Sequence, residues 1–430
     1  LYFLQQVYIF SIFTLIYRIY SLLYKMILVE QHIISKNNLL WKQCDHLCFL
    51  SKNLYNSTLY RIKNHYQETG KFLRYNHLAK EFLQNDQQDF RALPSSTSQQ
   101  ILMVFDQNIK SFFKLIRKWK NNKKSLSGCP HLPNYKHKIK GRNIIIFTSQ
   151  QSRVKDGFIH LPKKVDLAPI KTKVKEKIKQ VRIVPKSSCY VIEVVYERQE
   201  KEHIQNDRYL SIDLGVNNLT TCFDSKNQSS FIINGRPLKS MNQYFNKKKG
   251  NIQSDLEKNH KKKTSKRLSK LTMKRNNKIK DYLHKSSGTI VDYCIKNNIS
   301  NVVIGLNKEW KQGSNIGKKN NQNFVQIPFD KLIKMITYKG QLEGIKVVTH
   351  EESYTSKCSS LDLEMLCHHD TYLGKRMKRG IFLSKDWIKI NADLNGAINI
   401  LRKETGDKLI NLETLTSRGQ AVWPVKVNLN

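Results

Sequence analysis

Acidic residues are scarce in this chain of 430 residues. Its 34 Asp and Glu face 75 Lys and Arg, which gives a formal net charge of +41. A protein this basic repels itself unless a polyanion neutralises it. A basic surface that is merely solvated is the alternative, but the excess is large and clustered. We therefore predict a nucleic-acid partner.

The chain also lacks the cysteine spacing of a disulfide framework. Its eight cysteines are scattered, at positions 44, 48, 129, 189, 222, 294, 358 and 367. This excludes a disulfide-stapled scaffold and indicates a reducing compartment. We expect a cytoplasmic protein associated with the nucleoid.

A convincing membrane span is missing as well. Residues 1–24 are apolar and aromatic, but Arg18 interrupts them, and neither a basic n-region nor a small-residue cleavage site accompanies them. The first methionine is Met26. We interpret residues 1–25 as translated upstream DNA that is not native structure, and we predict no membrane partner. A basic membrane protein anchored by residues 1–24 is the alternative.

Hydrophobic patterning changes several times along the remaining chain. Alternating stretches predict a β-rich, barrel-like module that is split by an inserted helical domain. Farther on, strands alternate with helices, which predicts an α/β domain with a short insert. The expected boundaries are 26–36 and 126–206 for the β-rich module, 37–125 for the helical domain, 207–355 and 381–405 for the α/β domain, 356–380 for its insert and 406–430 for a C-terminal tail.

Positive charge concentrates in residues 236–285, which hold 17 Lys or Arg and three acids. A helix there presents cations on most of its faces, suited to phosphate contacts that read no base sequence. A solvated helix is the alternative. With Arg379 from a second basic run, the predicted nucleic-acid contacts are Lys247, Lys248, Lys249, Lys261, Lys262, Lys263, Lys266, Arg267, Lys270, Lys274, Arg275 and Arg379.

Two aspartates lie in contexts that suit metal binding. Asp213 alternates with the aliphatic residues of a strand at 210–214, so its side chain leaves the opposite face. Asp393 follows the candidate N-cap Asn391, which places it in the first turn of a helix whose apolar stripe packs on a sheet. Phosphodiester hydrolysis by two Mg²⁺ ions about 3.5–4 Å apart requires such carboxylates from different elements.

A third acid is needed to complete such a site. Glu351 and Glu352 directly follow a predicted strand at 345–350 and form the best available pair. A role in capping turns is the alternative for any single acid of this kind. Three meandering strands followed by alternating strands and helices is the order of a ribonuclease H-like (RuvC-type) fold, an analogy at the level of the fold.

Four motifs in this order resemble the TnpB (OrfB-type) proteins of bacterial insertion elements, which are related to the Fanzor proteins and the type V CRISPR effectors. They are SIDLGVNNL at 211–219, INGRPLKS at 233–240, YTSKCS at 354–359 and NADLNGA at 391–397. The resemblance implies an RNA-guided, Mg²⁺-dependent DNA endonuclease. Its guide RNA comes from the transposon end and pairs with double-stranded target DNA, and one RuvC-like site cuts both strands. A separate tyrosine transposase of the same element is the expected joining enzyme.

The chain departs from this family at the middle catalytic acid. In the commonest form a Glu follows the fourth strand, where this chain has Gly305. Some members of the wider family carry the acid just before the YTSK stretch, which favours Glu352 over Glu351. Glu309 is a weaker candidate. The resemblance thus implies catalysis and Mg²⁺ binding by Asp213, Glu352 and Asp393.

A second departure concerns zinc. The family usually carries two Cys-x-x-Cys pairs in the insert, whereas this chain has Cys358 and Cys367, nine residues apart, followed by two histidines. We predict a degenerate zinc-ribbon-like insert that has lost its zinc. Two rival functions remain: a catalytically inactive RNA- and DNA-binding relic of the family, and an accessory transposase protein.

Overall fold

The computed structural model describes residues 25–306, 325–417 and 423–429. The described chain divides into two compact units, one over Lys25–Arg198 and the other beginning at Gln199. The interpretation of residues 1–24 and the candidate Glu309 concern positions outside the described residues. Within the described ranges, no helix is long and apolar enough to cross a membrane.

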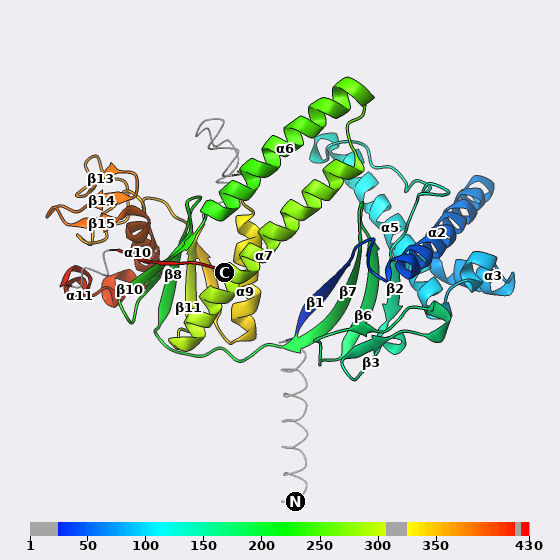
Figure 1. Cartoon of the computed structure of the whole chain (residues 1–430), viewed down its shortest axis with the longest axis horizontal. Helices are drawn as coiled ribbons and strands as arrows, with labels where there is room; N and C mark the ends of the chain where they lie inside the picture. Colours follow the sequence, from blue (N-terminus) through cyan, green and yellow to red (C-terminus); the bar gives the residue numbers. More distant parts are fainter. Residues whose placement is uncertain (1–24, 307–324, 418–422, 430) are drawn as a thin grey trace, which may run out of the picture. The chain divides into compact units, whose positions relative to one another are not determined.

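The unit over Lys25–Arg198 combines a four-stranded sheet with helices (Figure 1). Strand β1 pairs with β7 in the order β1-β7-β6-β2, so the helices are inserted between strands of one sheet. Alternate residues of β2, β6 and β7 pack with the apolar faces of α2 and α5 in one core. The elements are β1 (Lys25–Ile34), α2 (Trp41–Thr69), α3 (Tyr75–Gln84), α4 (Gln88–Arg91), α5 (Ser95–Asn121), β2 (Ile145–Thr148), β3 (Arg153–Lys155), β4 (Phe158–His160), β5 (Ile170–Lys171), β6 (Ile178–Pro185) and β7 (Tyr190–Gln199).

The unit that contains the two aspartates is built on a six-stranded sheet of order β12-β11-β8-β9-β10-β16. Strands β8, β9 and β10 form an antiparallel meander, and β11 and β12 continue the sheet in parallel to β8. The elements are β8 (Tyr209–Leu214), β9 (Asn218–Asp224), β10 (Ser229–Asn234), α6 (Arg236–His260), α7 (Lys266–Lys296), β11 (Asn301–Gly305), α9 (Phe329–Leu342), β12 (Lys346–His350), β13 (Lys375–Lys378), β14 (Ile381–Leu383), β15 (Lys389–Asn391), α10 (Ala392–Thr405), α11 (Leu412–Ser417) and β16 (Val425–Val427).

Helices cover both faces of this sheet. Leu210, Ile212 and Leu214 of β8 share a core with residues of α7 and α9. The residues that alternate with them face α10, where the Ser211 hydroxyl donates a hydrogen bond of 2.6 Å to the carbonyl of Ala397. The predicted alternation of β8 and the predicted mixed α/β class are therefore confirmed.

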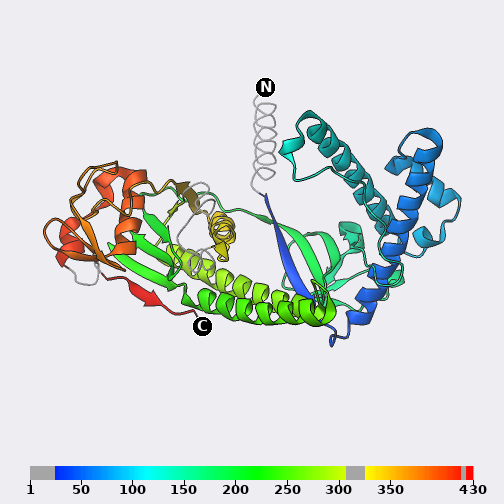
Figure 2. The same cartoon turned by 90° about the horizontal axis from the view of Figure 1, so that it is seen from above.

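Helices α6 and α7 are long and basic and run side by side (Figure 2). Pro237 lies in the first turn of α6, where its missing N–H costs no hydrogen bond. The Ser265 side chain caps α7 by accepting a hydrogen bond of 3.1 Å from the Leu268 N–H.

Two features were not predicted. Strands β13, β14 and β15 form a small antiparallel sheet that crosses the expected boundary at residue 380. Strand β16 extends the six-stranded sheet by pairing in parallel with β10, so the segment expected to be a tail contributes to the fold.

Candidate active site

Asp213 lies near the end of β8, in the middle of the sheet. The residue keeps some exposed surface, and its carboxylate lies against α10 at Gly396. A Cβ atom at Gly396 would lie 3.3 Å from Asp213 Oδ2, tighter than most contacts of this kind. Gly396 therefore allows the helix to pass directly beside this carboxylate.

Asp393 occupies the first turn of α10, as predicted. The Asn391 side chain caps the helix by accepting hydrogen bonds from the N–H groups of Asp393 (3.0 Å) and Leu394 (3.1 Å). The Asn218 side chain donates a hydrogen bond of 2.7 Å to Asp393 Oδ2, and Arg376 Nη2 lies 3.9 Å from Oδ1. These contacts fix one carboxylate oxygen and leave a cation near the other.

Glu352 enters the site through the space beside Gly305. Strand β11 places Ile304 opposite Ile212 of β8, so Gly305 falls level with Asp213. A Cβ atom at Gly305 would lie 2.6 Å from Glu352 Oε1 and 2.8 Å from Glu352 Cγ. Any side chain at position 305 would therefore collide with the Glu352 side chain.

Glu351 lies outside this site. Its side chain is exposed and accepts a hydrogen bond from the Ser353 hydroxyl, while its carbonyl accepts one of 3.0 Å from Lys403 Nζ. Of the two adjacent glutamates, the structure brings only Glu352 to Asp213.

The three carboxylates influence one another electrostatically. Burial, followed by the negative charges of Glu352 and Asp393, holds the pKa of Asp213 well above its usual range, and Arg376 acts in the opposite direction. Burial raises the pKa of Glu352 to about 7, while Lys403 opposes this shift. Concentrated negative charge of this kind is relieved by a bound cation or by protons.

The donor set fits a hard divalent cation, since three carboxylates from three different elements offer only oxygen ligands. In the described part of the chain, however, no group of three or more His, Cys, Asp or Glu side chains is arranged to hold a metal ion as it stands. The carboxylates would have to turn toward one another to share one.

Cys358 and Cys367, the two cysteines considered as zinc ligands, lie in the segment between β12 and β14. Cys358 is buried and donates its thiol to the carbonyl of Met365 at 3.3 Å. Cys367 Sγ lies 3.4 Å from His369 Nε2. The predicted loss of zinc stays a prediction.

Most of the predicted nucleic-acid contacts are exposed cations on α6, on α7 or in the connection between them, and Arg379 is exposed beyond β13. Lys249 is half-buried. Arg275 differs from the others, because its Nε and Nη2 lie 2.9 and 2.6 Å from Asn242 Oδ1. Its guanidinium also lies over the Phe245 ring, and burial lowers its pKa. In this structure Arg275 joins α7 to α6.

Two residues of the site were not identified from the sequence. Asn218 follows the tight turn after β8, and its position in the motif at 211–219 was the available signal. Arg376 belongs to the basic run at 375–380, but nothing in the sequence places it beside Asp393.

Comparison with known proteins agrees with the sequence motifs. Residues 191–311 match the OrfB_IS605 family, described as "Probable transposase", and residues 329–400 match the Cas12f1-like TNB domain. The predicted resemblance to the OrfB-type proteins is confirmed by these matches.

Two curated relatives are similar over part of their length. A CRISPR-associated endodeoxyribonuclease Cas12f2 of Micrarchaeota archaeon (strain CG1_02_47_40) is 28% identical over 246 residues, which cover 53% of this chain and 42% of that protein. The TnpB-like protein ORF457 of Acidianus two-tailed virus is 35% identical over 94 residues, 21% of this chain and 19% of that protein. The matches thus span less than half of either relative.

Two solved structures are also similar. A Cas12f1-sgRNA-target DNA complex contains a chain with 18% identity and a TM-score of 0.34, with 87% of this chain and 98% of that chain covered. A CRISPR-Cas12f ternary complex gives 16% identity and a TM-score of 0.34, with 84% and 80% covered.

Proposed function

We propose that this chain, with its OrfB-type and Cas12f1-like segments, is an RNA-guided DNA endonuclease. Its single ribonuclease H-like (RuvC-type) site would comprise Asp213, Glu352 and Asp393. One curated relative is named an endodeoxyribonuclease. Asp213 lies in the segment that matches the OrfB_IS605 family, and Asp393 lies in the segment that matches the Cas12f1-like TNB domain.

The arrangement of the sheet supports this proposal. An antiparallel meander of β8, β9 and β10, extended in parallel by β11 and β12, is the strand order expected for a ribonuclease H-like domain. In this order the first strand is central, so an acid near its end meets residues that follow the neighbouring strands.

The observation that carries the proposal is the relation between Gly305 and Glu352. The family's usual middle acid would occupy position 305, and the Glu352 side chain fills the space next to that position. The missing acid is thereby replaced from the end of β12, on the same edge of the sheet.

Each residue of the site has a role that its contacts suggest. Asp213, Glu352 and Asp393 would hold Mg²⁺, which when bound activates water and neutralises charge on the phosphate. Asn218 orients the Asp393 carboxylate, and the cap at Asn391 fixes the helix that carries it. Arg376 supplies positive charge next to Asp393.

The proposed partners are a guide RNA and double-stranded target DNA. The exposed cations of α6 and α7 are suited to contact phosphates without reading bases. A separate tyrosine transposase of the same element stays a prediction.

A catalytically inactive binding protein is the second candidate. It is favoured by one observation: in residues 25–306, 325–417 and 423–429 no group of three or more acids, histidines and cysteines is arranged to hold a metal ion. Such a protein would occupy its targets without cutting them.

Cleavage of a target plasmid decides between the two. The protein is produced with RNA transcribed from the flanking element, and Asp213→Ala and Asp393→Ala serve as controls. Mg²⁺-dependent cutting by the wild-type protein, but by neither variant, would support the nuclease. RNA binding without cutting would support the inactive protein.

A further inference from the structure

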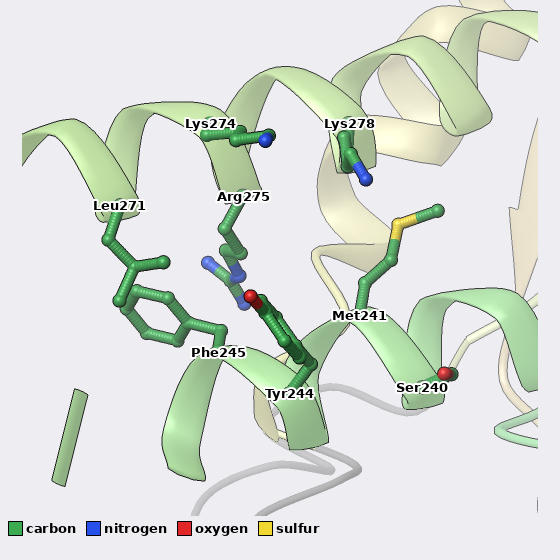
Figure 3. Close-up of a pocket in the computed structure, with 8 residues that line it drawn as sticks. All are labelled: Ser240, Met241, Tyr244, Phe245, Leu271, Lys274, Arg275 and Lys278. Carbon is green, nitrogen blue, oxygen red and sulfur yellow. The ribbon is translucent and has the colours of Figure 1, made fainter. Parts of the chain in front are cut away.

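A pocket of about 320 Å³ lies between α6 and α7, in the most basic part of the chain (Figure 3). Tyr244 and Phe245 of α6 line it from one side, and Leu271, Lys274, Arg275 and Lys278 of α7 line it from the other. None of its eight lining residues is acidic. The pocket thus combines aromatic surface with positive charge.

The aromatic wall is accessible and firmly supported. Tyr244 is 62% exposed, a large fraction for an aromatic side chain, whereas its neighbour Phe245 is buried. Arg275 lies over the Phe245 ring, 5.4 Å from its centroid, and is held by Asn242. The two helices are therefore joined at the pocket.

Lysines lie beside the exposed ring and along the pocket. Lys274 and Lys278 are exposed and one turn apart on the same face of α7. Lys248 Nζ lies 5.9 Å from the centroid of the Tyr244 ring. An anionic occupant with a flat apolar part satisfies both features, because the ring offers a stacking surface and the ammonium groups attract a negative charge.

We infer that this pocket binds an unpaired nucleotide of a single-stranded nucleic acid. The base stacks on Tyr244, and Lys274 and Lys278 contact the adjoining phosphates. The inference rests on the proposed function only in taking nucleic acid as the partner, and it is independent of the carboxylate site. Either RNA or DNA supplies this chemistry, so both are tested.

The test uses the full-length protein in EDTA, which prevents cleavage. Short single-stranded DNA and RNA oligonucleotides carry the fluorescent base 2-aminopurine, whose emission falls when it stacks. Quenching is expected with the wild-type protein and with Tyr244→Phe, which keeps the ring. It is expected to be lost with Tyr244→Ala but kept with Tyr60→Ala, a matched control whose side chain is 60% exposed.

Affinity measured over a series of salt concentrations separates stacking from charge. Tyr244→Ala should weaken binding roughly 5- to 150-fold with an unchanged salt dependence, since stacking releases no counterions. Lys274→Ala should reduce the slope of log K against log salt by about 0.7. If Tyr244 contributes to the binding of only DNA or only RNA, the inference is supported and the result identifies which nucleic acid the pocket binds.

Two results would overturn the inference: unchanged quenching and affinity in Tyr244→Ala, or an equal loss in Tyr60→Ala. The outcome is distinct from that of the cleavage test. If the protein cuts no DNA but binds nucleic acid through Tyr244, the proposed nuclease activity is refuted and the proposed nucleotide pocket is supported. If it cuts DNA and Tyr244→Ala has no effect on binding, the nuclease activity is supported and the pocket is refuted.

Discussion

Gly305→Ala should destabilise this protein because the space for a methyl group is already filled. The new Cβ atom would lie 2.4 Å from Ile400 Cδ1, 2.6 Å from Glu352 Oε1 and 2.8 Å from Glu352 Cγ. All three distances are shorter than real contacts, and Ile400 is buried in α10. Overpacking of this kind costs about 1–3 kcal/mol.

The cost should fall when the Glu352 side chain is shortened. Two of the three clashes involve Glu352, so Gly305→Ala and Glu352→Ala should be coupled by about 0.5–3 kcal/mol in a double-mutant cycle. Ile400→Val removes Ile400 Cδ1, the third atom that lies too close to the new Cβ atom. The free energies come from urea unfolding of the metal-free protein, which needs no nuclease activity.

Gly250→Ala is the matched control. Gly250 lies on α6, and nothing lies within 4 Å of a Cβ atom placed there. This change should stabilise the helix by about 0.5–1 kcal/mol. A Gly305→Ala variant as stable as the wild type, or additive with Glu352→Ala, would refute the packing of Glu352 against Gly305.

Three further outcomes follow from the site. Because burial raises the folded-state pKa of Glu352 from 4.5 to about 7, its contribution to stability is full below pH 4.5 and is lost as the pH rises through 7. Glu352→Gln should therefore stabilise the metal-free protein by about 1–3 kcal/mol at pH 8 and by much less at pH 5, and equal thermal shifts at both pH values would contradict this. Asn218→Ala frees the Asp393 carboxylate and should reduce cleavage about 10- to 100-fold, with no comparable loss of nucleic-acid binding. Lys261→Ala, Lys262→Ala and Lys263→Ala together should lower the salt dependence of duplex binding by up to about 2.7 units of slope, and an unchanged slope would exclude phosphate contacts there.

The elements of the unit built on the six-stranded sheet were largely predictable, because their signals are local. Asp213 alternates with buried aliphatic residues in β8, and Asn391 caps α10 as its side chain predicts. Strands β13, β14, β15 and β16 escaped prediction because each is only three or four residues long, and because all four residues of β13 are exposed and three of them are cationic. Their pairing partners stabilise them more than their own sequence does.

The composition of the candidate site was predictable only in part. The motifs made Asp213 and Asp393 candidates and left two adjacent glutamates as candidates for the third acid. Glu352 differs from Glu351 because its side chain occupies the space next to Gly305, between β11 and α10. That space is created by packing between segments that are distant in the sequence. Arg275 shows the same limit, since the adjacent Lys274 is an exposed cation while the guanidinium of Arg275 is held by Asn242.

Cleavage by Glu352→Gln and Glu351→Gln, compared on the same guide and target, tests the central claim most directly. The two substitutions are chemically identical and one residue apart. If Glu352 completes the site, Glu352→Gln should abolish cutting while Glu351→Gln retains it, with RNA binding unchanged in both. Retained cutting by Glu352→Gln would contradict the assignment.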